Sequence, residues 1–168
     1  PDAVAAHADP GISADELADR LINEDPSVQL IDLRSKAEYE AYHLPGAIHI
    51  PLDSILSEKW MPYVDQISNM NIFYGNGSIL ASEAVILTRQ LGIRNNFMLD
   101  GGLNGWFSII IQPERPDPGA PEEDWELYHA RLAAKQFFMG GDATGLETAP
   151  ALPPVPRRKK TRVQGGCS

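Results

Sequence analysis

The chain has 168 residues, 43% of them hydrophobic, and a formal net charge of −9 at pH 7. A chain of this size and composition can bury one sizeable hydrophobic core. Its acidic balance argues against nucleic-acid binding, because contacts with phosphates supply most non-specific affinity. No apolar window reaches the ~20 residues that a membrane-spanning helix needs, so no span is predicted.

Short helical and strand-like segments alternate over the first two thirds of the chain. Ser13 and Glu16 have the spacing of a capping box, which favours a helix start. Short apolar runs bounded by turn residues indicate buried strands. The elements expected in chain order are a helix over 13–23, a strand over 28–32, a helix over 34–42, a strand over 47–50, a short helix capped by Asp53, a helix over 60–67, a strand over 72–74, a helix over 81–91, a strand over 96–100 and a helix over 103–110 capped by Asp100.

This alternation predicts an α/β fold with a mostly parallel sheet and helices on both faces. In open α/β sheets, ligands bind at the carboxyl edge of the strands. Tyr74 ends one of the expected strands, so the loop after it is expected at that edge.

Beyond Trp106 the pattern changes. A proline-rich linker over 112–121 precedes a helix expected over 122–138. Its Trp125, Tyr128, Leu132 and Phe138 are expected to pack back on the domain. The predicted organisation is a tail over 1–11, a domain over 12–110, a linker and helix over 111–138, and a disordered basic tail over 139–168.

The loop from Gly75 to Leu80 joins a strand to the start of a helix, where unpaired backbone N–H groups favour an anion. Gly75 stands where a nucleophile would belong, and no lysine follows Gly77 as a phosphate-binding P-loop requires. Ser78 is the only hydroxyl in the loop, and we interpret it as a helix cap or an anion contact rather than a nucleophile. The residues expected to cradle an anion are Gly75, Asn76, Gly77, Ser78, Ile79 and Leu80.

Four ordered blocks of sequence, at 31–35, 38–39, 43–51 and 99–106, resemble the rhodanese-like domain. They read IDLRS, EY, HLPGAIHIP and LDGGLNGW, and the resemblance extends over roughly 12–110. It implies a three-layer α/β domain with about five strands and a role in sulfur transfer. In that family the loop carries a persulfide-forming cysteine and an arginine, and Gly75 and Leu80 fall on these two positions. The resemblance therefore implies the family's scaffold without its loop chemistry.

Asp32, Arg34 and Glu38 are open to two interpretations. They could form an acid/base cluster, yet an arginine beside carboxylates lowers their pKa and leaves them poor general acids. The resemblance implies a structural network for these three residues, and we favour that role.

Cys167 is the only cysteine, so no internal disulfide is possible, and it follows a run of five cationic residues over 157–162. Nearby positive charge favours a thiolate, so this tail could carry a persulfide, although an incidental terminal cysteine is the simpler interpretation. The histidines show no ligand spacing, so neither a metal nor a cofactor is predicted. Since the chain starts at Pro1 rather than methionine, no compartment is indicated.

Two hypotheses remain from the sequence. The first is a non-catalytic module that binds a small anion or a partner protein at the loop. The second is a sulfurtransferase or sulfur carrier, working with a sulfur-bearing protein, in which Cys167 replaces the missing loop cysteine.

Overall fold

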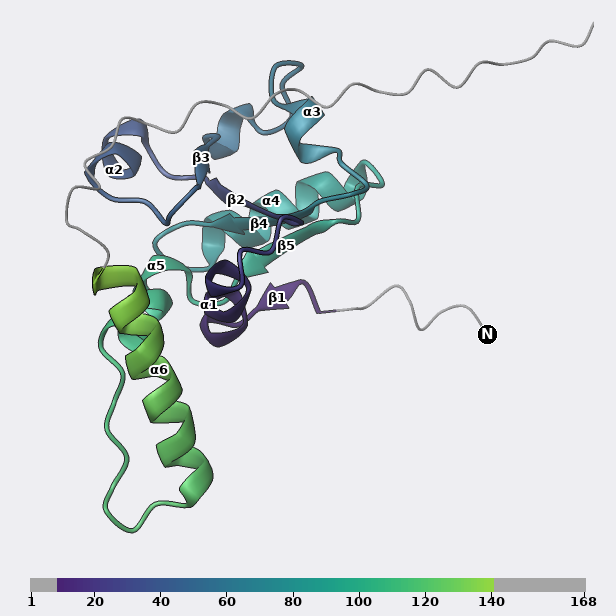
Figure 1. The fold of residues 1–168 in the computed structure, drawn as a ribbon. Coiled ribbons are helices and arrows are strands. Elements are labelled where there is room, and N and C mark those ends of the chain that lie inside the picture. The colour runs from purple at the N-terminus through teal and green to yellow at the C-terminus, as the bar shows by residue number, and fades with distance from the viewer. Residues whose placement is uncertain (1–8, 141–168) are drawn as a thin grey trace, which may run out of the picture.

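The computed structural model describes residues 9–140, which form a five-stranded parallel sheet between helices (Figure 1). The strand order is β1-β5-β4-β2-β3, and all four pairings are parallel. The predicted α/β architecture is therefore confirmed. The strands are β1 (Gly11–Ile12), β2 (Val28–Asp32), β3 (Ile48–His49), β4 (Met70–Tyr74) and β5 (Asn96–Leu99).

Helices connect the strands and follow the last of them. The α-helices are α1 (Ala14–Ile22), α2 (Lys36–Ala41), α3 (Met61–Val64), α4 (Ile79–Gln90), α5 (Gly102–Trp106) and α6 (Glu122–Gly140). A 3₁₀ turn, η2 (Leu52–Ser54), and a π-helical turn, η3 (Phe107–Ile111), complete the set.

Side chains alternate along the central strands and build a hydrophobic core on each face of the sheet. On β4, Ile72 and Tyr74 join one core and Phe73 joins the other. The first core lies with α1, α5 and the end of α6, and includes Leu17, Leu103 and Trp106. The second lies with α3 and α4. Because both faces are covered, β4 is buried at the centre of the sheet and fixes the loop that follows it.

Several local expectations are corrected. The two-residue strand β1 was not predicted, and it pairs with Met98 and Leu99 at the sheet edge. Asp53 does not cap a helix, because it lies inside η2, whose N-cap is Pro51 without a side-chain bond. Asp100 does not cap α5, because Gly101 occupies the N-cap with a φ of +72°. The helix expected over 60–67 is confined to α3.

Helix α6 forms an arm on the domain. Figure 1 shows its C-terminal end against α5 and its N-terminal half projecting away beside the preceding linker. Ala134 is buried, Phe138 packs edge-on against Trp106 with ring centroids 5.0 Å apart, and Arg131 pairs with Asp15 of α1. Of the four residues expected to pack back on the domain, Phe138 reaches this core, whereas Leu132 is 37% exposed.

Within residues 9–140 no helix combines the length and the apolar character needed to cross a membrane. The tail predicted for 139–168 lies outside the described residues from position 141 onward, and so does Cys167.

Candidate functional site

The candidate site is the loop that leaves β4 and enters α4. Gly75 is buried, whereas Asn76 and Gly77 are exposed. The carbonyl groups of the loop turn toward α5: the N–H of Leu103 donates to Gly75 O at 2.9 Å, and the N–H of Asn104 donates to Asn76 O at 2.9 Å. The carbonyl oxygens of the loop therefore hold it against α5.

Gly102 makes this arrangement possible. Its φ is +58°, and a Cβ there would lie 2.5 Å from Gly77 O, 2.6 Å from Gly75 O and 2.8 Å from Asn76 O. Three successive loop carbonyls thus converge on one Cα atom, and only glycine leaves room for them. In the sequence, Gly102 appears only as one residue of the LDGGLNGW block, because the contact depends on residues 25 or more positions away.

The N–H groups of the loop are left for other partners. Those of residues 76–80 donate to no other residue in the described part of the chain. They lie at the N-terminus of α4, where the helix dipole adds a partial positive charge. This arrangement of donors suits a small anion.

One of the two roles expected for Ser78, the helix cap, is not found. Ser78 occupies the N-cap position of α4 but makes no side-chain capping bond. Its hydroxyl oxygen instead accepts a hydrogen bond from the N–H of Gly101 at 3.0 Å. The side chain therefore joins the loop to α5, which supports the same fixed geometry as the carbonyl contacts.

Leu80 lies over Gly75. A Cβ on Gly75 would lie 3.2 Å from Leu80 Cδ1 and 3.3 Å from Leu80 Cβ, which is tight but calls for a shift of only a few tenths of an ångström. The φ of Gly75 is not in the left-handed region, so its backbone can accept a side chain. The loop thus retains a backbone compatible with a nucleophile, with an apolar side chain above that position.

Asp32 and Arg34 form a buried ion pair beneath the loop. Arg34 Nε donates to Asp32 Oδ1 at 3.0 Å and Arg34 Nη2 donates to Asp32 Oδ2 at 2.7 Å, with side-chain exposures of 6% and 0%. Arg34 also donates to the carbonyl of Tyr42 and, at 3.3 Å, to Asn76 Oδ1. The guanidinium therefore holds the end of β2, the segment after α2 and the loop together.

Glu38 contacts the same loop from α2. Asn76 Nδ2 donates to Glu38 Oε1 at 2.8 Å, and the hydroxyl of Ser35 donates to Glu38 Oε2 at 2.8 Å. The Ser35 hydroxyl and the Asn76 amide hold the pKa of Glu38 below its usual range. Glu38 is therefore ionised at neutral pH and is poorly suited to donate a proton. Ser35 and Glu38 also form a capping box for α2. They have the same Ser-x-x-Glu spacing as Ser13 and Glu16, so this signal was present in the sequence but was not used.

Exposed apolar side chains lie on the first turn of α4 and on the segments that directly follow α2 and α5. The rings of Tyr42 and Phe107 pack with centroids 5.2 Å apart and are 42% and 37% exposed. Ile79, in the first turn of α4, is 76% exposed. We call Tyr42, Phe107 and Ile79 the rim. By contrast, Trp60, Tyr63 and Trp106 are buried.

The described residues contain no group of three potential metal ligands. The two histidines near the site serve as packing and bonding groups: His43 Nδ1 bonds to Tyr39 O at 2.8 Å and His49 Nε2 bonds to Arg34 O at 2.7 Å. Both rings stack on Tyr39.

The family model for the rhodanese-like domain matches residues 13–109. This range includes the whole loop after β4 and every strand except β1. The chain belongs to the rhodanese-like domain family. The resemblance seen in the four sequence blocks is thereby confirmed. The relatives to which the chain is similar include two named as sulfurtransferases and one whose name gives no reaction.

The chain is 30% identical over 95 residues to the thiosulfate:glutathione sulfurtransferase of Saccharomyces cerevisiae, covering 50% of this chain and 68% of that protein. It is 31% identical over 93 residues to the adenylyltransferase and sulfurtransferase UBA4 of Meyerozyma guilliermondii, covering 49% and 21%. It is 28% identical over 142 residues to the centrosomal protein of 41 kDa of Bos taurus, covering 79% and 34%. The chain thus spans only a fifth to a third of the latter two relatives.

Solved structures agree on the fold. A crystal structure of an Anabaena protein is 27% identical, with a TM-score of 0.53, covering 71% of this chain and 91% of that one. A solution structure of the rhodanese-like domain from the same Anabaena protein is 26% identical, with a TM-score of 0.52, covering 68% and 89%.

Replacing Gly102 with alanine should displace the loop and lower stability. The left-handed backbone alone costs a residue with a side chain about 1–2 kcal/mol, and the three carbonyls must also move. Gly77→Ala is the matched control, because a Cβ there meets nothing within 4 Å and its φ is not left-handed. Thermal unfolding together with amide shifts of residues 75–80 checks this. Equal effects of the two variants would contradict the role assigned to Gly102.

Proposed function

We propose that this rhodanese-like domain is a non-catalytic binding module that takes a small anion or a partner protein at the loop after β4. The observation that carries the proposal is Gly75, a buried loop residue without a side chain, with Leu80 packed over it. A covalent sulfur intermediate needs a nucleophile at this position, and glycine offers none.

The donor groups of the loop support anion binding. Consecutive N–H groups over 76–80 have no partner among the described residues, whereas the carbonyls of Gly75 and Asn76 are bonded to α5. No cationic side chain of the loop itself assists, since Leu80 stands at the position of the family's arginine. Arg34 contacts Asn76, but its charge is matched by Asp32.

The rim supports a protein partner at the same place. Tyr42, Phe107 and Ile79 expose apolar surface beside a loop whose polar groups remain open. The bovine centrosomal relative covers 79% of this chain, more than the domain alone, and its name describes a location rather than a reaction. An apolar rim around unpaired donors fits a peptide that offers both an apolar side chain and an acceptor group.

A second candidate is a sulfurtransferase or sulfur carrier that uses Cys167. It is favoured by the names of two relatives, both of which are sulfurtransferases. Cys167 lies outside the described residues. Mass measurement after exposure to thiosulfate or a low-molecular-weight persulfide separates the candidates, because only the sulfur carrier accumulates one extra sulfur on Cys167.

Titration with sulfate, thiosulfate or phosphate should shift the amide signals of residues 75–81 in a saturable manner. Binding should be weak and sensitive to salt, because interactions at an exposed helix N-terminus contribute only ~0.3–1 kcal/mol each and the acidic chain repels anions. Sodium chloride at matched ionic strength is the control. If no amide signal of this loop shifts at low ionic strength, the loop is a structural turn, and the proposal that it binds a small anion fails.

A further inference from the structure

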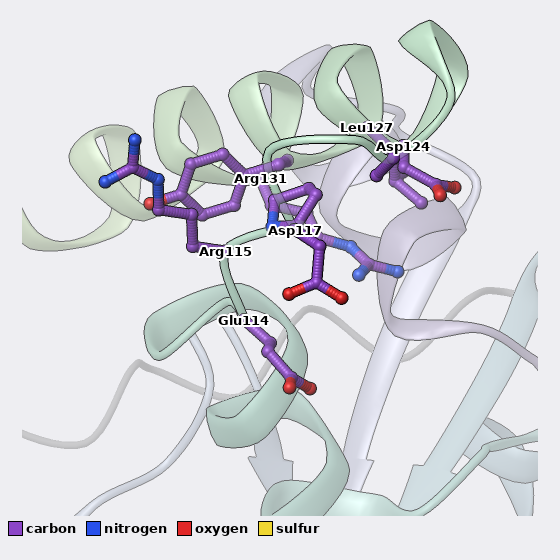
Figure 2. A pocket seen from close by; sticks show the side chains of 9 residues that line it. Glu114, Arg115, Asp117, Asp124, Leu127 and Arg131 are labelled. Carbon is purple, nitrogen blue, oxygen red and sulfur yellow. The ribbon is translucent and has the colours of Figure 1, made fainter.

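The linker before α6 folds back on the helix and leaves an open groove of about 350 Å³ between them (Figure 2). Leu127 and Tyr128 of α6 and Pro116 of the linker are among the residues that line it. Nothing in the rhodanese-like core forms this groove, and the family match ends at residue 109. It is a feature of the C-terminal arm.

Negative charge dominates the groove. Glu114, Asp117 and Asp124 line it, and none of the three makes an ion pair or a side-chain hydrogen bond to any other described residue. Figure 2 shows these carboxylates along the groove, with the guanidinium groups of Arg115 and Arg131 on opposite sides. The acidic groups are therefore available to a cationic occupant.

The two arginines that line the groove are already engaged. Arg131 donates to Asp15 Oδ1 at 2.9 Å and Oδ2 at 2.7 Å, so its charge is neutralised from α1. Arg115 lies over the ring of Trp125, with Cζ 5.5 Å from the centroid. Neither arginine therefore forms an ion pair with the three carboxylates, and these outnumber Arg115, the only groove-lining cation that no described carboxylate neutralises.

A cationic segment of the same chain starts shortly after the arm. Arg157, Arg158, Lys159, Lys160 and Arg162 follow residue 156 with no acidic residue between them. Residues 141–156 separate this segment from Gly140, the end of α6. We call residues 157–162 the basic segment.

The length of this connection suffices for the distance to be covered. A helix rises 1.5 Å per residue, so the stretch from Gly140 back to Asp124 measures about 24 Å. A chain of about 16 residues can reach at most ~3.3–3.6 Å per residue when fully extended, so the connection is long enough to cover this distance.

We propose that the basic segment of this chain docks in the acidic groove between the linker and α6. The Arg and Lys side chains pair with Glu114, Asp117 and Asp124, and their aliphatic stems lie on Leu127 and Tyr128. The tail thereby covers the exposed arm. The proposal does not depend on what the loop after β4 binds.

Cys167 gives a direct test, because it is the only cysteine and lies five residues beyond the basic segment. A nitroxide label on Cys167 of the full chain should attenuate the amide signals of residues 114–131 at low salt. The attenuation should be lost in E114Q/D117N, whereas E58Q/E83Q should retain it. The control removes two negative charges from exposed residues elsewhere on the domain, so the net charge is equal.

A second variant acts on the tail alone. R157S/R158S/K159S/K160S should lose the attenuation as fully as E114Q/D117N, and 0.5 M NaCl should reduce it in the unmodified chain because salt screens the pairs. Attenuation spread evenly over the domain would overturn the proposal. So would an equal loss of attenuation in E114Q/D117N and in the control E58Q/E83Q. Attenuation seen only between a labelled and an unlabelled copy would assign the groove to the tail of a second molecule instead.

Discussion

Replacing Arg34 with alanine should lower the free energy of unfolding by about 3–5 kcal/mol, because it leaves the fully buried carboxylate of Asp32 without its partner. The loss includes the bonds that tie Tyr42 and Asn76 to the guanidinium. Since small domains are stable by only about 5–15 kcal/mol, the variant should unfold at markedly lower urea concentration.

Two further variants separate the buried pair from simple loss of charge. Lys36→Ala removes an exposed cation two positions away, whose contact with Glu40 is 3.6 Å, and should change stability by less than about 0.5 kcal/mol. Arg34→Lys keeps the charge but not the bidentate geometry, so its loss of stability should lie between those of Arg34→Ala and Lys36→Ala. If the Arg34→Ala protein is as stable as the unmodified chain but no longer binds anions, Arg34 belongs to the binding site and not to the scaffold.

Introducing a cysteine and an arginine into the loop, as Gly75→Cys with Leu80→Arg, should create sulfurtransferase activity. The thiolate attacks the outer sulfur of thiosulfate and releases sulfite, and the resulting persulfide passes that sulfur to cyanide as thiocyanate. The N–H groups of residues 76–80 and the helix dipole of α4 lower the pKa of such a thiol and favour its thiolate.

The geometry explains why both changes are needed. The Cβ of a cysteine at position 75 would lie 3.2 Å from Leu80 Cδ1 and 3.3 Å from Leu80 Cβ. Leu80→Arg removes the first of these contacts and adds a positive charge. Gly75→Ser with Leu80→Arg is the matched control, because it fills the same space without a thiol. All variants should carry Cys167→Ser. A folded double variant without thiocyanate production would show that the loop no longer has a catalytic shape.

The sequence predicted much of the fold because the strands are short apolar runs separated by turn residues. Val28–Asp32 and Met70–Tyr74 are examples, and both appear as central strands. The strand β1 was missed because two residues cannot show a period. The caps assigned to Asp53 and Asp100 were wrong, since Pro51 and Gly101 occupy the cap positions and the pattern does not show which residue starts a helix.

The sequence predicted where the candidate site lies, but not the contacts that its residues make. The strand, the glycines and the following helix located the loop, whereas the closure of its carbonyls on Gly102 and the bond from Gly101 to Ser78 required the packing of α5. The link from Glu38 to Asn76 spans α2 and the loop, and no local spacing indicates it. The acidic groove was missed because it forms only when the proline-rich linker folds back on α6.

The measurement that tests the central claim most directly is cyanide-dependent thiocyanate production from thiosulfate by the unmodified chain and by its Cys167→Ser variant. Because Gly75 cannot form a persulfide, we expect no thiocyanate above the protein-free background from the Cys167→Ser chain. Production that appears in the unmodified chain and disappears in Cys167→Ser would favour the sulfur carrier. Turnover that survives the loss of Cys167 would contradict a non-catalytic loop.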